Sequence, residues 1–225
     1  MFNSLFKKIT RFSALPISRK IQYLENSYFK IKGILIYRFI FKQFGRGSLM
    51  RTPLFVSYES VQVGEDVLIW DDARIETVEC YADSEFLPSI ILGHGVTIEQ
   101  RCHITAASKL CIGNGTIMLF DVMITDIDHE YQNLNLPVRQ QPLAVAKTII
   151  GENCFIGSGA KINAGTTLGK HCIVGASAVV RGSFPDYCVI VGAPAKIIKR
   201  FNPETQTWDR TDSQGDFLVR SCNQL

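Results

Sequence analysis

The sequence predicts an all-β solenoid built from six-residue repeats, with a helical segment before it and a short tail after it. In the second half of the chain an aliphatic residue recurs at every sixth position without a slip. A period of six fits neither an α-helix, with about 3.6 residues per turn, nor the two-residue alternation of a sandwich. It fits a coil in which every sixth side chain meets an equivalent environment. The aliphatic positions are Ile150, Ile156, Ile162, Leu168, Val174 and Val180.

The N-terminal segment, residues 1–50, is expected to be helical and basic. Residues 1–46 contain ten Lys or Arg and one acid, a net charge of +9, whereas the rest of the chain has a net charge of −6. Two interpretations remain open: helices that cover the apolar end of the solenoid, or a peripheral surface on the anionic inner face of a membrane. Large apolar residues recur there at helical spacing, at Ile21, Leu24, Tyr28, Ile31 and Leu35.

Residues 51–200 are expected to form the solenoid itself. A glycine follows the aliphatic residue at positions 151, 157, 169 and 175, and Asn163 takes this place once. Both residue types suit a corner at which φ is positive. With the earlier units there are twelve hexads, or roughly four coils of three hexads each. The earlier units begin at Val63, Ile69, Leu92, Ile98, Ile104, Ile112 and Met118.

A small residue stands four positions after each aliphatic residue, where a triangular coil has little interior room. Three of the seven cysteines, Cys102, Cys154 and Cys172, occupy this position. The number of cysteines is odd and no CxxC pair occurs, so we expect buried thiols and no disulfide framework. In the longest run the small residues are Cys154, Ala160, Thr166, Cys172 and Ala178.

The overall composition is that of a globular chain. With 225 residues, of which 46% are hydrophobic, the chain can bury the core of one substantial domain. The sequence shows no secretory cleavage pattern and no long uninterrupted apolar stretch, so we expect a reducing, cytoplasmic location. We expect no nucleic-acid partner. The tail, residues 201–225, lacks the repeat, and we expect its Trp208 to anchor it as it folds back on the last coil.

The repeat is interrupted by a polar segment that we expect to be an extruded loop, residues 125–148. The segment contains two prolines, and its sole histidine is His129. Loops expelled from a rigid scaffold commonly carry chemistry. The loop is therefore the first place to look for a catalytic group.

Three stretches of the chain carry more specific patterns: ITDIDHEY at 124–131, IIGENCFIGSGAKINAGTTLGKHCIVGASAVV at 149–180, and FPDYCVIVGAPAKIIKR at 184–200. Together they resemble the hexapeptide-repeat acyltransferases, in particular the sugar O-acetyltransferases of polysaccharide and capsule biosynthesis. The likeness covers about residues 60–200. It implies a parallel left-handed β-helix, a homotrimer, and active sites in clefts between neighbouring subunits, where acetyl-CoA is the donor substrate.

The resemblance also implies roles for individual residues. His129 would be the general base that takes the proton of an acceptor hydroxyl as its oxygen attacks the thioester. The backbone N–H of Ser158 would face the thioester oxygen. Asp126 or Asp128 would orient the imidazole, or a backbone carbonyl would serve equally, and the sequence leaves this choice open. The residues implied to bind acetyl-CoA are Phe155, Ser158, Ala176, Arg181, Lys196 and Lys199.

We therefore predict acetyl transfer from acetyl-CoA to a hydroxyl of a sugar or sugar-containing intermediate in bacterial O-antigen or capsule biosynthesis. The alternatives are N-acetylation of an amino sugar or nucleotide amino sugar on the same scaffold, and a solenoid scaffold without catalysis. The acceptor would be selected by variable loops such as Tyr81–Ser89 and Asn133–Gln141. The sequence does not distinguish O-acetylation from N-acetylation.

A zinc site is not predicted. Hydratases on similar solenoids need three histidines, two of them five residues apart, whereas the histidines here are spaced 9, 26 and 42 residues apart. We expect His94 and His171 on the surface, and His103 either on the surface or in the cleft. The four histidines are His94, His103, His129 and His171.

Overall fold

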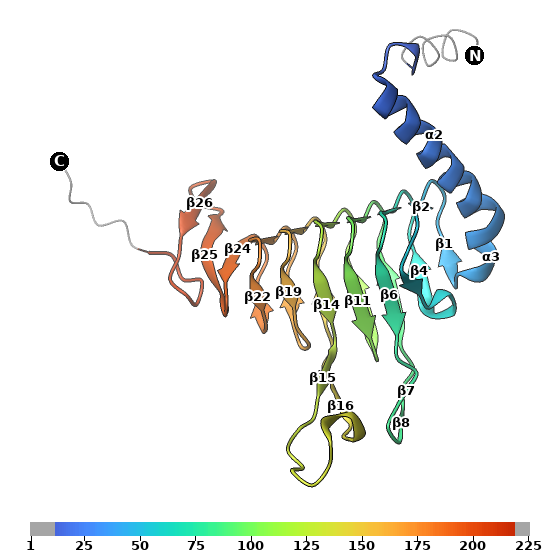
Figure 1. Cartoon of the computed structure of the whole chain (residues 1–225). Coiled ribbons are helices and arrows are strands. Elements are labelled where there is room, and N and C mark those ends of the chain that lie inside the picture. The colour runs from blue at the N-terminus through green and yellow to red at the C-terminus, as the bar shows by residue number, and fades with distance from the viewer. Residues whose placement is uncertain (1–11, 219–225) are drawn as a thin grey trace.

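The computed structural model describes residues 12–218, which form a three-faced coil of short parallel strands (Figure 1). The chain visits the three faces in turn, so each coil adds one strand to each face. The first face contains β1 (Gln43–Phe44), β4 (Val61–Val63), β9 (Ser89–Leu92), β12 (Lys109–Ile112), β17 (Ile149–Ile150), β20 (Thr167–Leu168) and β23 (Ser183–Phe184).

The second face contains β2 (Leu49–Met50), β5 (Leu68–Ile69), β10 (Thr97–Ile98), β13 (Ile117–Met118), β18 (Phe155–Ile156), β21 (Ile173–Val174) and β24 (Cys188–Gly192). The third face contains β3 (Phe55–Val56), β6 (Arg74–Thr77), β11 (His103–Ala106), β14 (Met123–Thr125), β19 (Lys161–Ile162) and β22 (Val179–Val180). Equivalent hexad positions are paired in register, since Ile104 is paired with both Ile75 and Ile124.

Among the described residues there are six complete coils, followed by β23 and β24 of a seventh, where the sequence predicted roughly four coils. The first coil was missed because its inward positions are Phe44, Met50 and Val56, which do not form an aliphatic-glycine pattern. On the third face, the inward Ile75 and Ile124 are followed by Glu and Thr in place of glycine. The six-residue period was therefore predicted correctly, but its extent was underestimated.

The inward side chains form one continuous apolar core along the coil. Burying each large aliphatic side chain contributes about 1.5–3 kcal/mol. The small positions are buried as predicted, and the six cysteines in the described part of the chain are free thiols. Burial raises the pKa of the Cys102 thiol to about 12, so this thiol is uncharged at neutral pH. Four of these cysteines are buried and fill the narrow interior: Cys102, Cys154, Cys172 and Cys188.

The glycines that follow the inward residues do not have the positive φ that we expected. Positive φ occurs two positions later, for example at Asn153 (54°) and His171 (55°). The reason for glycine is the close approach of neighbouring coils. A Cβ atom added to Gly151 would lie 2.5 Å from the carbonyl carbon and oxygen of Gly169 in the next coil.

We expect the substitution Gly151→Ala to lower the free energy of unfolding by about 1–3 kcal/mol, because the backbone of the next coil must move to admit the methyl group. The matched control is Asn163→Ala, since Asn163 occupies the same hexad position and already has a side chain. Urea unfolding of both variants measures the difference. Equal stability of the two variants would contradict the close-approach explanation.

A continuous helical segment precedes the first coil, made of α2 (Ile17–Lys32), the π-helical turn η1 (Gly33–Tyr37) and α3 (Arg38–Ile40). The end of the coil is covered by an aromatic cluster in which the Phe41 ring lies 5.0 Å from both Phe44 and Tyr58 and 5.7 Å from Tyr37. No helix among residues 12–218 is long and apolar enough to cross a membrane.

The helical spacing of the N-terminal apolar residues is confirmed, and the helical segment covers the end of the coil as one of the two interpretations expected, but not through these residues. No residue of α2 is buried. The cover comes instead from Tyr37 and Phe41, which follow α2. Residues 1–11 of the basic segment lie outside the described residues. The exposed apolar residues of the predicted stripe are Ile21, Leu24, Tyr28, Ile31 and Leu35.

The other end of the coil finishes in two antiparallel strands, β25 (Ala195–Asn202) and β26 (Thr207–Arg210), which extend the second face. Trp208 lies against Phe201, with ring centroids 5.9 Å apart, and against His171 of the last coil at 6.2 Å. The prediction that the tail folds back through Trp208 is confirmed for this part. Residues 219–225 of the tail lie outside the described residues.

Candidate active site

Two segments leave the coil at the same corner, where strands of the third face end (Figure 1). The shorter one forms the hairpin β7 (Cys80–Tyr81) and β8 (Ser84–Glu85) after β6. The longer one forms the antiparallel pair β15 (Ile127–His129) and β16 (Leu143–Val145) after β14. Strand β11 lies between β6 and β14 in the third face. The two segments therefore flank the outer surface of β11.

A cleft of about 260 Å³ lies between these two segments. Its floor is formed by outward side chains of β11 and β14, and its walls by β7, β15 and β16. The lining contains no Asp, Glu, Lys or Arg side chain. The lining residues are Val78, Tyr81, His103, Thr105, Met123, Thr125, Ile127, His129 and Leu143.

His129 lies at the end of β15, where its backbone pairs with that of Leu143. The imidazole is exposed and has an edge-on contact with the Tyr81 ring, at 5.4 Å between centroids. Within the described residues no hydrogen bond engages the ring nitrogens of His129. The imidazole can therefore accept a proton from a molecule that enters the cleft.

His103 is exposed and lines the floor of the same cleft, so it lies both on the surface and in the cleft, the two locations expected for it. Its Nε2 lies 2.8 Å from Thr105 Oγ1, within hydrogen-bond distance. Burial, and then the positive charge of Arg74, lower the pKa of His103. His103 is consequently uncharged at neutral pH and can exchange hydrogen bonds with a hydroxyl group.

Asp126 is fully buried, and its carboxylate accepts hydrogen bonds from outside the loop. The N–H of Ala107 donates to Oδ1 at 2.8 Å, and Ser108 donates to Oδ2 through its N–H at 2.9 Å and its hydroxyl at 2.6 Å. These bonds tie the start of the extruded segment to the turn after β11. The placement does not support the alternative in which Asp126 orients the imidazole of His129.

Asp128 lies on β15 one residue before His129, and its Oδ2 accepts a hydrogen bond from Arg181 at 2.6 Å. Arg181 follows β22, at the same corner as the extruded segment. Arg181, which we expected to contact acetyl-CoA, is thus ion-paired at the side of the cleft in this structure.

The other residues expected to bind acetyl-CoA lie on the second face or directly after its strands. Phe155 on β18 is 38% exposed. The N–H groups of Ser158 and Ala176 donate no hydrogen bond within the described residues, whereas the N–H of the preceding Gly157 and Gly175 each donate to the next coil. Lys196 and Lys199 are exposed on β25. These residues form a track along the coil axis, because β18, β21, β24 and β25 are consecutive in the sheet.

The track and the His129 cleft lie at opposite edges of the third face. Ser158 precedes β19, whereas the extruded segment follows the end of β14, and these two strands are paired in register. Within one chain the structure therefore does not bring His129 and Ser158 together.

The two remaining histidines are exposed, as predicted. Nδ1 of His94 accepts a hydrogen bond from the N–H of Glu65 at 3.1 Å, and His171 is in contact with Tyr187 and Trp208. Among residues 12–218 no group of three His, Cys, Asp or Glu side chains is arranged to hold a metal ion.

Comparison with protein families gives a match to "Bacterial transferase hexapeptide (six repeats)" at residues 147–182. Residues 147–182 therefore carry hexapeptide repeats similar to those of this family. The matched repeats are the two coils that directly follow the extruded segment, from β17 to β22.

The chain is also similar to two curated proteins. It is 34% identical over 128 residues to "Putative lipopolysaccharide biosynthesis O-acetyl transferase WbbJ" of Escherichia coli strain K12, over 54% of this chain and 65% of that protein. It is 31% identical over 154 residues to "Probable acetyltransferase Rv3034c" of Mycobacterium tuberculosis, over 68% of this chain and 48% of that protein. The chain thus spans less than two thirds of the length of either relative.

Among solved structures, the chain is similar to AntD, an N-acyltransferase from Bacillus cereus in complex with dTDP and 3-hydroxybutyryl-CoA. The TM-score is 0.61 at 16% identity, and the likeness covers 75% of this chain and 87% of that chain. At this identity the likeness concerns the fold of the hexapeptide-repeat coil.

Proposed function

We propose that the chain transfers the acetyl group of acetyl-CoA to a hydroxyl group of a sugar unit in the assembly of bacterial surface polysaccharide, such as O-antigen or capsule. The observation that carries the proposal is the cleft in which His129, with both ring nitrogens unengaged within the described residues, lies above a neutral floor. The likeness to a relative named as an O-acetyl transferase of lipopolysaccharide biosynthesis supports the same activity.

In the proposed reaction His129 is the general base. The acceptor oxygen attacks the thioester carbonyl carbon while the imidazole takes the hydroxyl proton. The C–S bond then breaks, and the proton passes to the leaving thiolate, which yields an ester and free coenzyme A. The unengaged N–H of Ser158 would stabilise the negative charge that develops on the carbonyl oxygen.

The lining of the cleft favours a hydroxyl acceptor over an amine. An amino sugar is an ammonium ion at neutral pH, and burying that charge is costly unless an acidic side chain pairs with it. No carboxylate lines the cleft, while His103 and Thr105 offer neutral partners to hydroxyl groups. The cleft therefore supports O-acetylation of a neutral sugar unit, and N-acetylation remains the alternative.

We further propose a left-handed sense for the coil and a homotrimer in which two chains complete each site. His129 and Ser158 of one chain lie at opposite edges of the third face. A site that uses both residues therefore needs a contribution from a second copy. Acetyl-CoA would lie along the track from Phe155 to Lys199. The free thiols of the described residues fit a reducing compartment, and we place the reaction in the cytoplasm.

The test is a coupled assay of thiol release from acetyl-CoA with a panel of neutral sugars, amino sugars and their nucleotide derivatives. We expect release that depends on a neutral acceptor. Release that depends only on amino sugars would favour N-acetylation, and no acceptor-dependent release with any member of the panel would contradict the proposal.

Tyr81 is expected to provide an aromatic surface for the sugar ring. Its ring contacts His129 and lines the cleft. We expect Tyr81→Ala to raise KM for the acceptor by about three- to ten-fold, with a smaller change in kcat, because a stacking contact of this kind is lost. Tyr81→Phe should restore KM.

The matched control for this prediction is Tyr131→Ala. Tyr131 belongs to the same extruded segment, is 68% exposed and does not line the cleft. Steady-state kinetics at saturating acetyl-CoA give both constants. An unchanged KM in Tyr81→Ala would remove Tyr81 from the acceptor site.

A further inference from the structure

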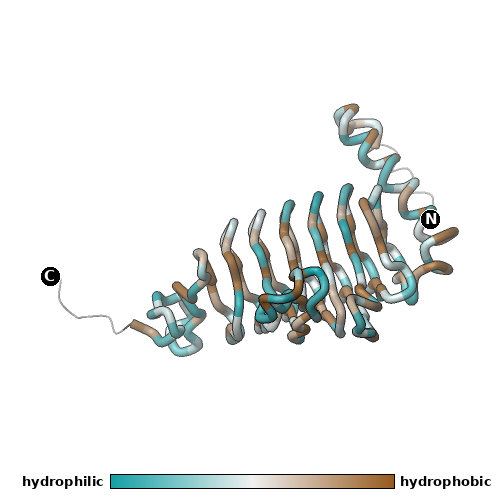
Figure 2. Tube along the Cα trace, turned by 60° about the horizontal axis from the view of Figure 1, so that its bottom comes forward, coloured by the Kyte–Doolittle hydropathy of each residue, from teal (hydrophilic) through white to brown (hydrophobic). Residues whose placement is uncertain are grey.

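Helix α2 and the turns after it expose a continuous apolar stripe. The stripe residues recur at three- and four-residue intervals, so they lie on one side of the helix. Helix α2 extends away from the coils in Figures 1 and 2, and among residues 12–218 the stripe remains exposed. The stripe consists of Ile17 (78% exposed), Ile21 (52%), Leu24 (59%), Tyr28 (62%), Ile31 (55%) and Leu35 (65%).

The stripe is on the side of the helix that faces away from the protein. The opposite side carries Asn26, Phe29 and Gly33, which are partly or fully buried. An ordinary surface helix has the reverse arrangement, with its apolar side toward the core. The stripe is therefore available to an apolar environment outside the chain.

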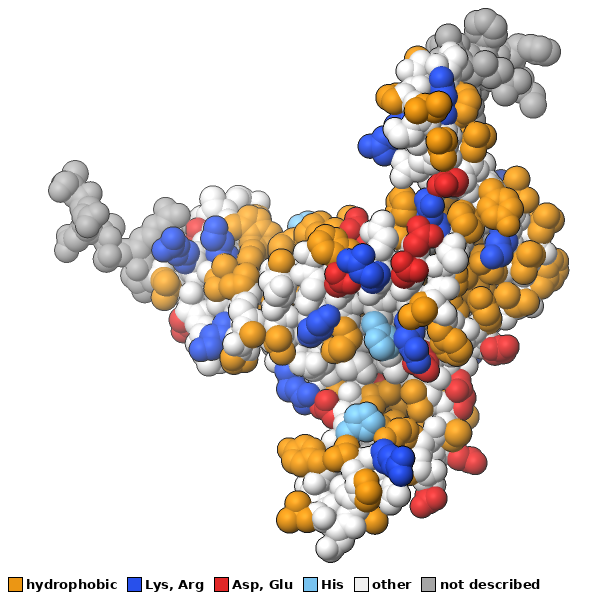
Figure 3. Space-filling view, viewed as in Figure 1, with side chains coloured by type: hydrophobic (Ala, Val, Ile, Leu, Met, Phe, Trp, Pro, Cys, Tyr) orange, Lys and Arg blue, Asp and Glu red, His pale blue; other side chains and the backbone are white. Residues whose placement is uncertain are grey.

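The charged side chains of this segment are predominantly basic. Between residues 12 and 46 the only acidic residue is Glu25, which is paired with Arg51 at 2.9 Å. Figure 3 shows blue and orange side chains along this helix. The basic residues of the same range are Arg19, Lys20, Lys30, Lys32, Arg38, Lys42 and Arg46.

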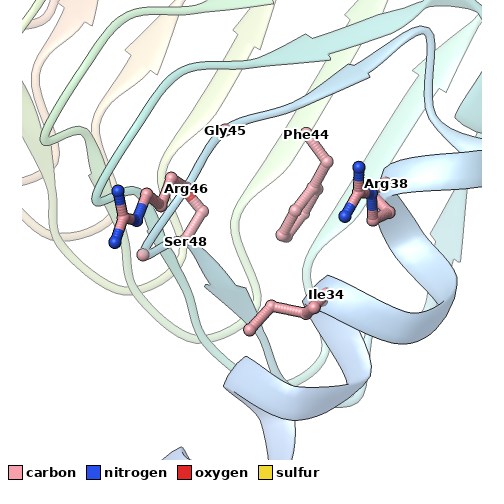
Figure 4. A pocket seen from close by; sticks show the side chains of 8 residues that line it. Ile34, Arg38, Phe44, Gly45, Arg46 and Ser48 are labelled. Carbon is pink, nitrogen blue, oxygen red and sulfur yellow. The ribbon is translucent and has the colours of Figure 1, made fainter.

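A cavity of about 410 Å³ lies at the base of the helix, and two of these basic residues, Arg38 and Arg46, line it. Figure 4 shows Arg38, from α3, on one side of Phe44 and Arg46, from the first coil, on the other. No carboxylate lines the cavity. The N–H groups of Arg46 and Gly47, which also line it, donate no hydrogen bond within the described residues. These groups match the oxygens of a phosphate.

We propose that the helical segment 17–40 and the Arg38–Arg46 cavity form a docking surface for an anionic phospholipid membrane. The stripe would enter the boundary between headgroups and acyl chains, with the helix lying along the surface. The flanking cations would meet anionic headgroups, and the cavity would hold a headgroup phosphate. This surface does not depend on acetyl transfer. It would place the cleft near a lipid-linked acceptor.

The test is cosedimentation of the full chain with vesicles of phosphatidylcholine, with and without phosphatidylglycerol. We expect binding to the anionic vesicles that weakens as salt is raised. The double variant Leu24→Gln/Ile31→Gln should lower the partition coefficient by about ten-fold or more. The double variant Arg38→Ala/Arg46→Ala should lower it by about five-fold for each arginine.

The matched control is Leu87→Gln/Leu134→Gln, because these leucines are 98% and 95% exposed and lie outside the helix. The control should bind as the wild type does. Equal recovery of the wild type in the supernatant with and without anionic vesicles would overturn the proposal. A change of oligomer mass in the Leu24→Gln/Ile31→Gln variant with unchanged vesicle binding would also overturn it, because the stripe would then be a subunit interface.

Discussion

Replacement of His129 by alanine is expected to lower kcat for acetyl transfer by about 10²–10⁴-fold. Two histidines line the cleft, His103 and His129. Only His129, at the end of β15, has an imidazole without a hydrogen bond to the described residues. Without it, the acceptor hydroxyl must lose its proton to water. Thiol release under saturating acetyl-CoA and acceptor measures the loss.

The control for this prediction is His94→Ala, since His94 is exposed on a corner of another coil. It should retain wild-type kcat. The exposed location of His129 also means that His129→Ala should unfold at the same urea concentration as the wild type. A wild-type rate in His129→Ala would show that the general base is another group.

Replacement of Asp126 by alanine is expected to have the second largest effect, on both stability and activity. The change removes the acceptor of three hydrogen bonds and leaves the N–H groups of Ala107 and Ser108 unsatisfied. We expect the free energy of unfolding to fall by about 2–5 kcal/mol. We also expect kcat/KM to fall under conditions where the protein is folded, because β15 would no longer be held at the edge of the cleft.

The matched control for Asp126 is Asp128→Ala. Asp128 is an acid two residues further along the chain, on β15, but its ion pair with Arg181 is partly exposed, with side chains 43% and 58% exposed. Loss of this pair should change the free energy of unfolding by about 1 kcal/mol or less. Urea unfolding combined with thiol release separates the two positions. A greater loss of stability in Asp128→Ala than in Asp126→Ala would contradict the anchoring role.

The coil was predictable because its sequence pattern is local and repeated. Each inward residue such as Ile156 or Val174 meets the same environment one coil later. The first coil escaped prediction because Phe44 and Met50 take its inward positions at the covered end, where Tyr37 and Phe41 supply aromatic neighbours to Phe44. The role of the glycines was misjudged because the distance between coils is not visible in one repeat.

The cleft was only partly predictable. His129 was identified from the interruption of the repeat, but Tyr81 and His103 meet it only through the stacking of three coils. A signal was present: the breaks after Ile75 and after Ile124 both follow a third-face strand, so both insertions leave one corner. Nothing in the sequence pattern indicated that Asp126 accepts a hydrogen bond from Ala107 and does not orient His129.

The most direct test of the account is to identify the product formed from acetyl-CoA and a neutral sugar acceptor by the wild-type chain. Mass spectrometry before and after mild alkali distinguishes an ester from an amide. We predict an acetylated sugar that forms in equal amount with free thiol and loses its acetyl group in alkali. An alkali-stable product, or thiol release without an acetylated sugar, would contradict the account.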